Sequence, residues 1–514
     1  MVLFSNNGVL VAALAVLLAL AVRAVFLRPK ITRHGVALRK PPNTLPLAGN
    51  GILFLQARQK LFSWFVKCER LFGYETFQIS VPTLPPGVVI NDPRNLEFVF
   101  KNEGTFLKGD FVKKRSWDLF GGYGIINSDG DLWKVQRKAG LNFLNTANLR
   151  VLTDVALPQY LFQSINYLKE RANGREVVDL QGVFHEITSQ LMGKMAYNME
   201  MHADDDFTLA FDYASGGTAE RFQNPLWFVT EVFFGGRLRK SIATVKAFGQ
   251  RIVANAEKDR QGRHASDFGV ADDADSKLDE VSGTLIQSLL DAVDDQNIVA
   301  DSALNYLSAG RDTTAQALTW GFYLLMKHPY VTGKIRQEAQ RVISEHEDSK
   351  TGPHGFDPTL FTPVSMPYTM AVFYEILRLY PPIPFEIRQA VADTTLPDGT
   401  FLPNSSVIVW CPWAMGRSMV TWGEDADAFR PDRWLAGGKL VSRSASEFPV
   451  FNGGPRTCLG KKMAEVIAVQ VAAGLALCFD FVPADDRERV SKSSLTLPME
   501  GGLPCFVRKR SYGS

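Results

Sequence analysis

The chain has 514 residues, of which 46% are hydrophobic, an ordinary proportion for a globular protein with a large core. Its 56 Lys and Arg residues nearly balance its 54 Asp and Glu residues, and the formal net charge of +2 gives no support for nucleic-acid binding through bulk charge. The five cysteines are scattered without a CxxC pair, a pattern that favours neither a disulfide framework nor a structural zinc site.

An apolar run from Gly8 to Leu27 contains one charged residue, Arg23, and is long enough for a helix to cross a bilayer. A cleaved signal peptide is the alternative, but no Lys or Arg precedes the run, and the run is long for such a peptide. We therefore interpret residues 1–30 as a single transmembrane anchor. Because Lys and Arg residues follow the run, the rest of the chain is expected on the cytosolic side.

The stretch RKPPNTLPLAGN, residues 39–50, contains three prolines, which favour an extended path. We interpret residues 31–50 as a stiff linker behind the anchor, and residues 51–514 as one domain. Apolar stripes with helical spacing predict helices at 57–73, 178–200, 240–258, 296–327, 329–347, 366–379 and 458–476. Shorter β-like runs lie at 75–79, 87–91 and 406–410. The predicted fold class is mainly α with a small β region, not a regularly alternating α/β sheet.

Three short motifs in the middle of the chain contain polar or charged residues that are candidates for a function. WKVQR spans residues 133–137. AGRDTT, residues 309–314, places a glycine, an acid and two hydroxyls inside a long apolar run, where they are locally unfavourable for a helix. Glu375 and Arg378 are spaced to share one helix face, although most such pairs are solvated surface pairs. Alone, AGRDTT is equally consistent with a bent but inert helix.

The stretch FNGGPRTCLG, residues 451–460, frames one cysteine with glycines. Glycines allow a tight turn, and Cys458 lies just before an apolar helical pattern, where a helix N-terminus favours a thiolate. A thiolate can be a nucleophile, a zinc ligand or an axial ligand of haem. A nucleophile would need a nearby histidine and zinc would need more ligands, whereas haem needs a single cysteine.

The last stretch resembles the FxxGxRxCxG haem-binding signature of the cytochrome P-450 superfamily, the haem-thiolate monooxygenases. The other motifs occur in the order typical of that family, from the linker to the C-terminus. The resemblance implies the cytochrome P-450 fold, haem b as cofactor, and Cys458 as the axial ligand of its iron. The signature residues that it assigns to cofactor binding are Phe451, Gly454, Arg456, Cys458 and Gly460.

The same resemblance assigns roles to residues outside the signature. Trp133, Arg137, Arg388 and Arg456 would contact the haem propionates. Glu375 and Arg378 would lock to Arg433, in FRPDRW, and hold the core. Thr313 and Asp312 would relay protons to dioxygen, for which Ala309 and Gly310 would make room.

The implied reaction is the NADPH- and dioxygen-dependent hydroxylation of an unactivated C–H bond. Electrons are expected from NADPH–cytochrome P-450 reductase, docked on a basic face that includes Lys461 and Lys462, at the endoplasmic reticulum membrane. The motifs look most like the branch of fungal and plant alkane and fatty-acid hydroxylases. This resemblance implies a lipophilic, long aliphatic, fatty-acid-like or polyketide substrate, with a terminal methyl as the target. A haem-thiolate isomerase and a haem-binding sensor are the alternatives. The segments expected over the substrate are 106–120, 222–227, 306–309, 383–385 and 497–501.

Overall fold

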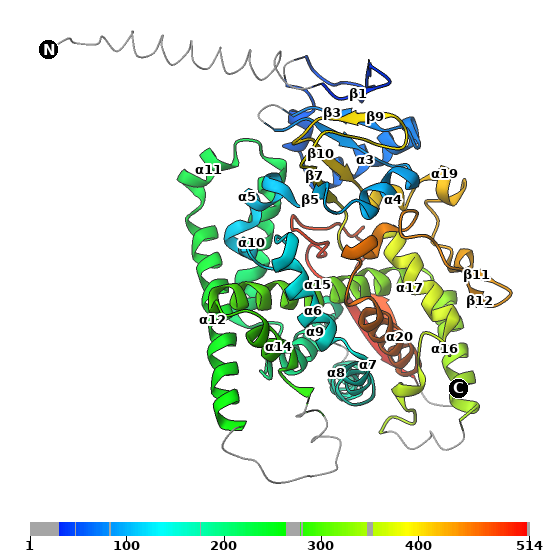
Figure 1. The fold of residues 1–514 in the computed structure, drawn as a ribbon. Helices are drawn as coiled ribbons and strands as arrows, with labels where there is room; N and C mark the ends of the chain where they lie inside the picture. Colours follow the sequence, from blue (N-terminus) through cyan, green and yellow to red (C-terminus); the bar gives the residue numbers. More distant parts are fainter. Residues whose placement is uncertain are drawn as a thin grey trace.

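The computed structural model describes residues 30–46, 48–81, 84–174, 176–263, 278, 281–346 and 353–510. Helices make up the larger part of the molecule, and the two sheets of β1–β5 and β7–β10 gather at the end that carries α3 (Figure 1). The helices of the first half are α2 Gly51–Phe54, α3 Arg58–Phe72, α4 Pro93–Lys101, α5 Gly109–Phe120, α6 Gly130–Phe143, α7 Thr146–Val151, α8 Leu157–Gly174, α9 Leu180–Tyr197, α10 Asp206–Gln223, α11 Trp227–Phe234 and α12 Gly236–Arg263. Those of the second half are α14 Thr284–Ala292, α15 Gln296–Lys327, α16 Pro329–Ser344, α17 Pro367–Leu379, α18 Pro412–Met415, α19 Met419–Trp422 and α20 Lys461–Cys478.

The largest sheet has five strands in the order β3-β4-β10-β7-β5. Its strands are β3 Phe77–Ile79, β4 Gly87–Val89, β10 Val407–Trp410, β7 Glu386–Ala390 and β5 Phe106–Leu107. β10 pairs parallel with β4 and antiparallel with β7. The short strands β1 Thr32–Arg33, β2 Val36–Ala37, β8 Thr394–Thr395 and β9 Thr400–Leu402 form a second sheet, and β13 Phe479–Pro483, β14 Pro504–Lys509 and β6 Val177–Asp179 a third. A two-stranded sheet pairs β11 Leu435–Ala436 with β12 Lys439–Leu440.

The long helix α15 runs through the middle of the helical part (Figure 1). Its N-cap is Asp295, whose side chain accepts a hydrogen bond from the Asn297 N–H, and it ends before Pro329, which opens α16. Most of its side chains are buried, because helices pack around it on several sides. A helix with this much burial is held by its packing, which allows it to carry a few residues that are poor helix formers.

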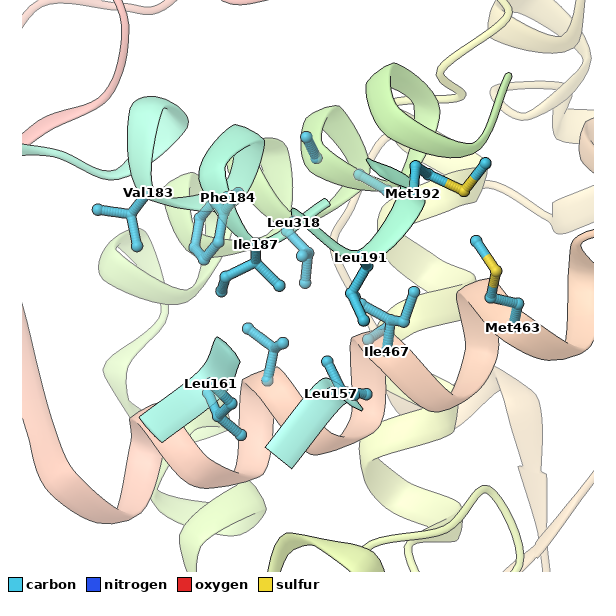
Figure 2. Close-up of a cluster of buried hydrophobic side chains, with 14 of the residues drawn as sticks. Leu157, Leu161, Val183, Phe184, Ile187, Leu191, Met192, Leu318, Met463 and Ile467 are labelled. Carbon is cyan, nitrogen blue, oxygen red and sulfur yellow. The ribbon is translucent and has the colours of Figure 1, made fainter. Parts of the chain in front are cut away.

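The main core lies where α8, α9, α15 and α20 meet. Figure 2 shows Leu157 and Leu161 of α8 and Met463 and Ile467 of α20 facing the apolar residues of α9. Leu318 of α15 lies in the same cluster. This packing fixes the start of α20, and therefore the loop before it, relative to α15.

The elements predicted from apolar periodicity are confirmed. All of the predicted stripes form helices, namely α3, α9, α12, α15, α16, α17 and α20, and the predicted β-like runs form β3, β4 and β10. Periodicity located them because each element buries one face or more.

The N-terminal predictions fare differently. The run from Gly8 to Leu27 lies outside the described residues, and among the helices that the structure does describe none is long and apolar enough to cross a membrane. Residues 31–38 pack on the domain instead of extending away from it, since β1 pairs with β9 and the side chains of Ile31 and Leu38 are buried in an apolar cluster. This part of the predicted linker therefore belongs to the folded domain, while the boundary at residue 51 stays a prediction.

Candidate functional site

The cysteine loop is a tight turn between a 3-10 segment and α20. The Cys458 N–H donates to the Phe451 carbonyl at 2.8 Å, which closes the loop. Gly454 has φ +62°, and a Cβ there would lie 2.3 Å from the Phe100 carbonyl oxygen, so that only glycine fits. Gly460, in contrast, borders open space, with no atom within 4 Å of where its Cβ would be. Close to Cys458, the backbone at Gly460 therefore has no neighbouring atoms over it.

The Cys458 side chain is exposed to a cavity, although protein atoms crowd the sulfur from its other sides. This burial raises the pKa of the thiol, while the Gly460 N–H and the nearby charges of Arg137 and Lys461 act in the opposite direction. The helix start that was expected to favour a thiolate is present, since α20 begins at Lys461. The pKa of the Cys458 thiol is nevertheless raised, because burial is the largest influence on it. A bound metal ion overrides this preference, because a coordinating thiol is deprotonated.

The cavity has a volume of about 550 Å³ and a predominantly apolar lining. The residues that the sequence assigned to cofactor binding and to proton relay line it, with the exception of Gly454. They come from α6, α15, β7 and the cysteine loop, four parts of the chain that are far apart in sequence.

One wall of the cavity is basic. Arg137 donates to the Thr457 carbonyl at 2.9 Å, and the guanidinium groups of Arg137 and Arg456 lie 5.5 and 4.3 Å from the Trp133 ring. Arg388 is buried and donates to Glu386 at 3.1 Å. These cations converge on one part of the wall, as a group with two carboxylates would require.

Arg456 pairs with two acidic residues that none of the sequence motifs indicated. Its guanidinium pairs with Glu103 at 3.0 Å and with Asp129 at 2.9 Å. Lys108 is another cavity residue that the motifs did not indicate. Burial and the nearby Arg388 lower its pKa to about 8, although Glu386 lies 3.5 Å from its Nζ.

α15 forms another part of the cavity wall, with Ala309 exposed to the cavity. The Thr313 hydroxyl donates to the Ala309 carbonyl at 2.6 Å, the backward bond that Ser and Thr side chains commonly make inside helices. Gly310 has a further role, because a Cβ there would lie 2.5 Å from the Met192 sulfur. Glycine at position 310 is therefore also required because α15 packs closely against α9 at this point.

Asp312 is buried, with one carboxylate oxygen that has no hydrogen-bond partner. Burial raises its pKa to about 6, against the attraction of Arg311, whose Nε lies 3.5 Å from the carboxylate. Arg311 is itself buried and lies 3.6 Å from Asp212, which is partly exposed. Asp312 therefore takes up a proton more readily than an ordinary carboxyl group, which suits a residue that relays protons.

The predicted substrate segments line the cavity in part. Lining residues come from 106–120, 222–227 and 306–309, and from all of 383–385. The prediction for 497–501 is wrong: Leu497 is fully buried, and its carbonyl accepts from Trp320, while the cavity is lined by Ser494, Leu495 and Thr496. Phe106, Trp117 and Trp227 do not line it either, and Trp117 is 49% exposed on the surface.

Glu375 and Arg378 are both fully buried on α17 and form a bidentate pair at 2.7 and 2.8 Å. Glu375 also accepts from Arg433 at 2.9 Å and from the Trp434 ring nitrogen at 3.0 Å. Arg378 donates to the carbonyls of the 416–428 loop. The predicted contact with Arg433 is confirmed, and the pair joins α17 to the segment that precedes the cysteine loop.

The residues present fit haem. A single cysteine sulfur faces the cavity, and the open space at Gly460 leaves room for a flat group beside it. The basic wall suits carboxylates, and residues of α15 line the same cavity. In the described parts of the chain, no three His, Cys, Asp or Glu side chains are placed to hold a metal ion.

Comparisons with known proteins agree with this geometry. The family model described as Cytochrome P-450 matches residues 40–506. Cytochrome P-450 94A1 of Vicia sativa is 29% identical over 493 residues, which cover 91% of this chain and 90% of that protein. Cytochrome P-450 CYP94D109 of Paris polyphylla is 32% identical over 471 residues, covering 87% of this chain and 90% of that protein. Cytochrome P-450 86B1 of Arabidopsis thaliana is 30% identical over 457 residues, 85% of this chain and 80% of that protein. The fold, the cysteine loop and these matches together show that the chain belongs to the cytochrome P-450 family.

Proposed function

We propose that this monooxygenase hydroxylates an unactivated C–H bond, with a terminal methyl as the target, in a long aliphatic, fatty-acid-like or polyketide substrate. One observation carries the proposal: a single, largely apolar cavity connects the Cys458 sulfur and the Thr313 hydroxyl with a lining of Phe, Leu, Ile and Val side chains. Such a lining offers an aliphatic chain burial without a polar partner at the reacting carbon. Fungal secondary-metabolite biosynthesis is one setting in which such substrates occur.

Enzymes of this family hold haem through a cysteine thiolate and receive their electrons from a reductase. We assign Cys458 as the thiolate ligand, and Arg137, Arg388, Arg456 and Trp133 as the residues that hold the propionates. Thiolate-bound haem supplies the activation of dioxygen. The chain's own contribution is to exclude water with the apolar lining, to orient the substrate and to deliver protons.

Asp312 and Thr313 are the proton-delivering residues in this proposal. The Thr313 hydroxyl lies on the cavity wall, and its bond to the Ala309 carbonyl fixes the direction of its oxygen. Asp312 follows Arg311 on α15, and burial raises its pKa so that it takes up a proton more readily than an ordinary carboxyl group. The partly exposed Asp212 lies on the far side of Arg311.

Replacing Thr313 with alanine tests the proposed reaction. The variant should bind haem normally but lose most product formed per NADPH, roughly 10- to 100-fold, because a positioned proton donor contributes factors of this order or more. The released peroxide should rise correspondingly. Product and peroxide, measured against NADPH consumed, give this ratio.

Thr319→Ala is the matched control. The Thr319 hydroxyl makes the same backward bond, to the Ala315 carbonyl at 2.7 Å, on the same helix, but Thr319 does not line the cavity. It should leave the product ratio unchanged. A Thr313→Ala enzyme that converts its substrate as efficiently as the wild type would instead favour an isomerase.

We also infer that the protein works at the endoplasmic reticulum membrane. The predicted anchor and the surface of α11 support this. None of the residues of α11 is buried, and the side chains of Val232, Phe233 and Phe234 are 69%, 74% and 84% exposed. A group of this kind suits a lipid surface better than water.

Lipid vesicles should therefore slow amide hydrogen exchange of residues 226–235 in the full chain. Phe233→Glu together with Phe234→Glu should remove most of that protection, because each buried Phe contributes about 1.5–3 kcal/mol. Val364→Glu, at a residue that is 90% exposed elsewhere on the molecule, serves as the control. Equal protection in all of these proteins would contradict a membrane contact at α11.

NADPH–cytochrome P-450 reductase is the proposed electron donor, with the N-terminal end of α20 as its docking face. Lys462 is exposed there, and Lys461, whose side chain is 45% exposed, lies 3.8 Å from Glu465. Rapid-mixing kinetics of haem reduction by this reductase, at low and high salt, measure the contribution of these charges. A rate that does not depend on salt would speak against a charged docking face.

A further inference from the structure

Arg58 is a buried cation on the cavity wall that the roles assigned above do not use. It opens α3, on the sheet side of the molecule (Figure 1), whereas the proposed propionate ligands lie on α6, β7 and the cysteine loop. Arg58 is 7% exposed, and burial lowers its pKa to about 10. Its surroundings thus disfavour the charge, as expected for a cation that lacks a counter-ion.

The hydrogen bonds of Arg58 go to neutral groups. Its terminal nitrogens donate to the carbonyls of Ser494 and of Thr496, the latter at 2.9 Å. Its Nε is buried and has no hydrogen-bond partner. No carboxylate among the described residues forms an ion pair with it, which sets it apart from the cavity cations Lys108 and Arg456.

Polar atoms accompany Arg58 at this part of the wall. The hydroxyls of Ser215 and Ser494 lie 2.8 Å apart, and both residues line the cavity together with Arg58. Around them the lining is apolar, with Phe54, Leu61 and Phe65 on one side. A buried positive charge beside two hydroxyls, inside an apolar cavity, matches the chemistry of a long chain that ends in an anion.

We propose that Arg58 binds the carboxylate of the substrate. This inference rests on the proposed long-chain hydroxylation and narrows it to free carboxylic acids, as opposed to alkanes, alcohols or esters. A carboxylate here supplies the missing counter-charge and accepts from the donors that remain, while the aliphatic chain follows the apolar lining. The charged end is thereby held away from the cysteine loop, and the other end of the chain is the part left to react.

The test compares a saturated long-chain fatty acid with its methyl ester, using the full-length, haem-loaded protein. Dissociation constants come from the change in haem absorbance and, independently, from thermal stabilisation. The wild type should bind the acid about 10- to 100-fold more tightly than the ester, because a hydrogen bond between charged groups changes the dissociation constant by a factor of about this size. Arg58→Gln keeps a donor for the carbonyls, and it should bind the ester as the wild type does but lose the preference for the acid.

Arg115→Gln is the matched control. Arg115 is 8% exposed, donates to the Phe111 and Arg221 carbonyls, and forms no ion pair with a described carboxylate, yet it is absent from the cavity wall. It should keep the preference for the acid. A merely structural role of Arg58 would weaken acid and ester alike in Arg58→Gln, and that result would overturn the inference.

The wild-type comparison decides the question even if Arg58→Gln does not fold. Equal affinity for acid and ester would overturn the role of Arg58 and leave the proposed hydroxylation standing. Binding of neither ligand would contradict the proposed long-chain substrate itself, and the inference with it.

Discussion

Replacing Cys458 with serine should reduce monooxygenase activity to background and abolish the reduced-CO difference spectrum of thiolate-bound haem. A serine hydroxyl does not ionise near neutral pH and is a poor soft ligand, so it cannot supply the electron density that thiolate ligation gives to the iron. The position offers no substitute, because in the described part of the chain Cys458 is the one cysteine that is exposed. We expect this to be the largest effect of any single substitution on activity.

The control for this experiment is Cys68→Ala. Cys68 is buried in α3, outside the cavity, and burial raises its pKa to about 12, so it behaves as a small apolar side chain. This variant should keep both the spectrum and the activity. A Cys458→Ser protein that retained both would show that Cys458 is not the thiolate ligand of haem.

Replacing Glu375 with alanine should have the largest effect on stability. The carboxylate is fully buried and balances Arg378 and Arg433. Its loss leaves Arg378 in the interior with no described carboxylate to pair with, and leaves Arg433 with Asp425 alone, at 3.4 Å. Breaking a buried pair in this way costs about 3–5 kcal/mol, which is a large part of the total stability of a typical domain. We expect little folded, haem-loaded protein, and a correspondingly lower midpoint of urea unfolding.

Glu345→Ala is a suitable comparison for Glu375→Ala. Glu345 pairs with Arg341 at 2.8 Å on α16, but both side chains are more than half exposed, at 53% and 51%. Exposed pairs contribute about 0–1 kcal/mol, so this variant should unfold nearly as the wild type does. Similar midpoints for Glu375→Ala and the wild type would show that the buried pair does not hold α17 to the 416–434 segment.

The sequence predicted best those features that depend on local spacing. Helices such as α15 and α17 were located because their apolar residues recur with the helical period. The cysteine loop was found because its turn requires Gly454, and the contact of Glu375 with Arg433 followed from the family resemblance. The signals for the helices and for the cysteine loop are each carried by a few residues close in sequence.

Long-range contacts left no such signal. Arg58 is a single arginine at the start of an amphipathic helix, and only the fold brings it to the same cavity as Cys458. The pairing of Arg456 with Glu103 joins residues from distant parts of the chain. The loop before β14 was misplaced for a related reason: it has no regular period, so the sequence did not distinguish the lining residue Thr496 from the buried Leu497.

The most direct test of the proposed function is product analysis with isotopically labelled dioxygen. Microsomes that contain the protein and NADPH–cytochrome P-450 reductase are supplied with NADPH and a panel of medium- and long-chain fatty acids, and the products are identified by mass spectrometry. We expect one labelled oxygen atom in a hydroxyl group at the terminal carbon. Unlabelled product would contradict the account. No product from a protein with an intact reduced-CO spectrum would exclude the fatty-acid substrates and leave the polyketide substrate to be tested.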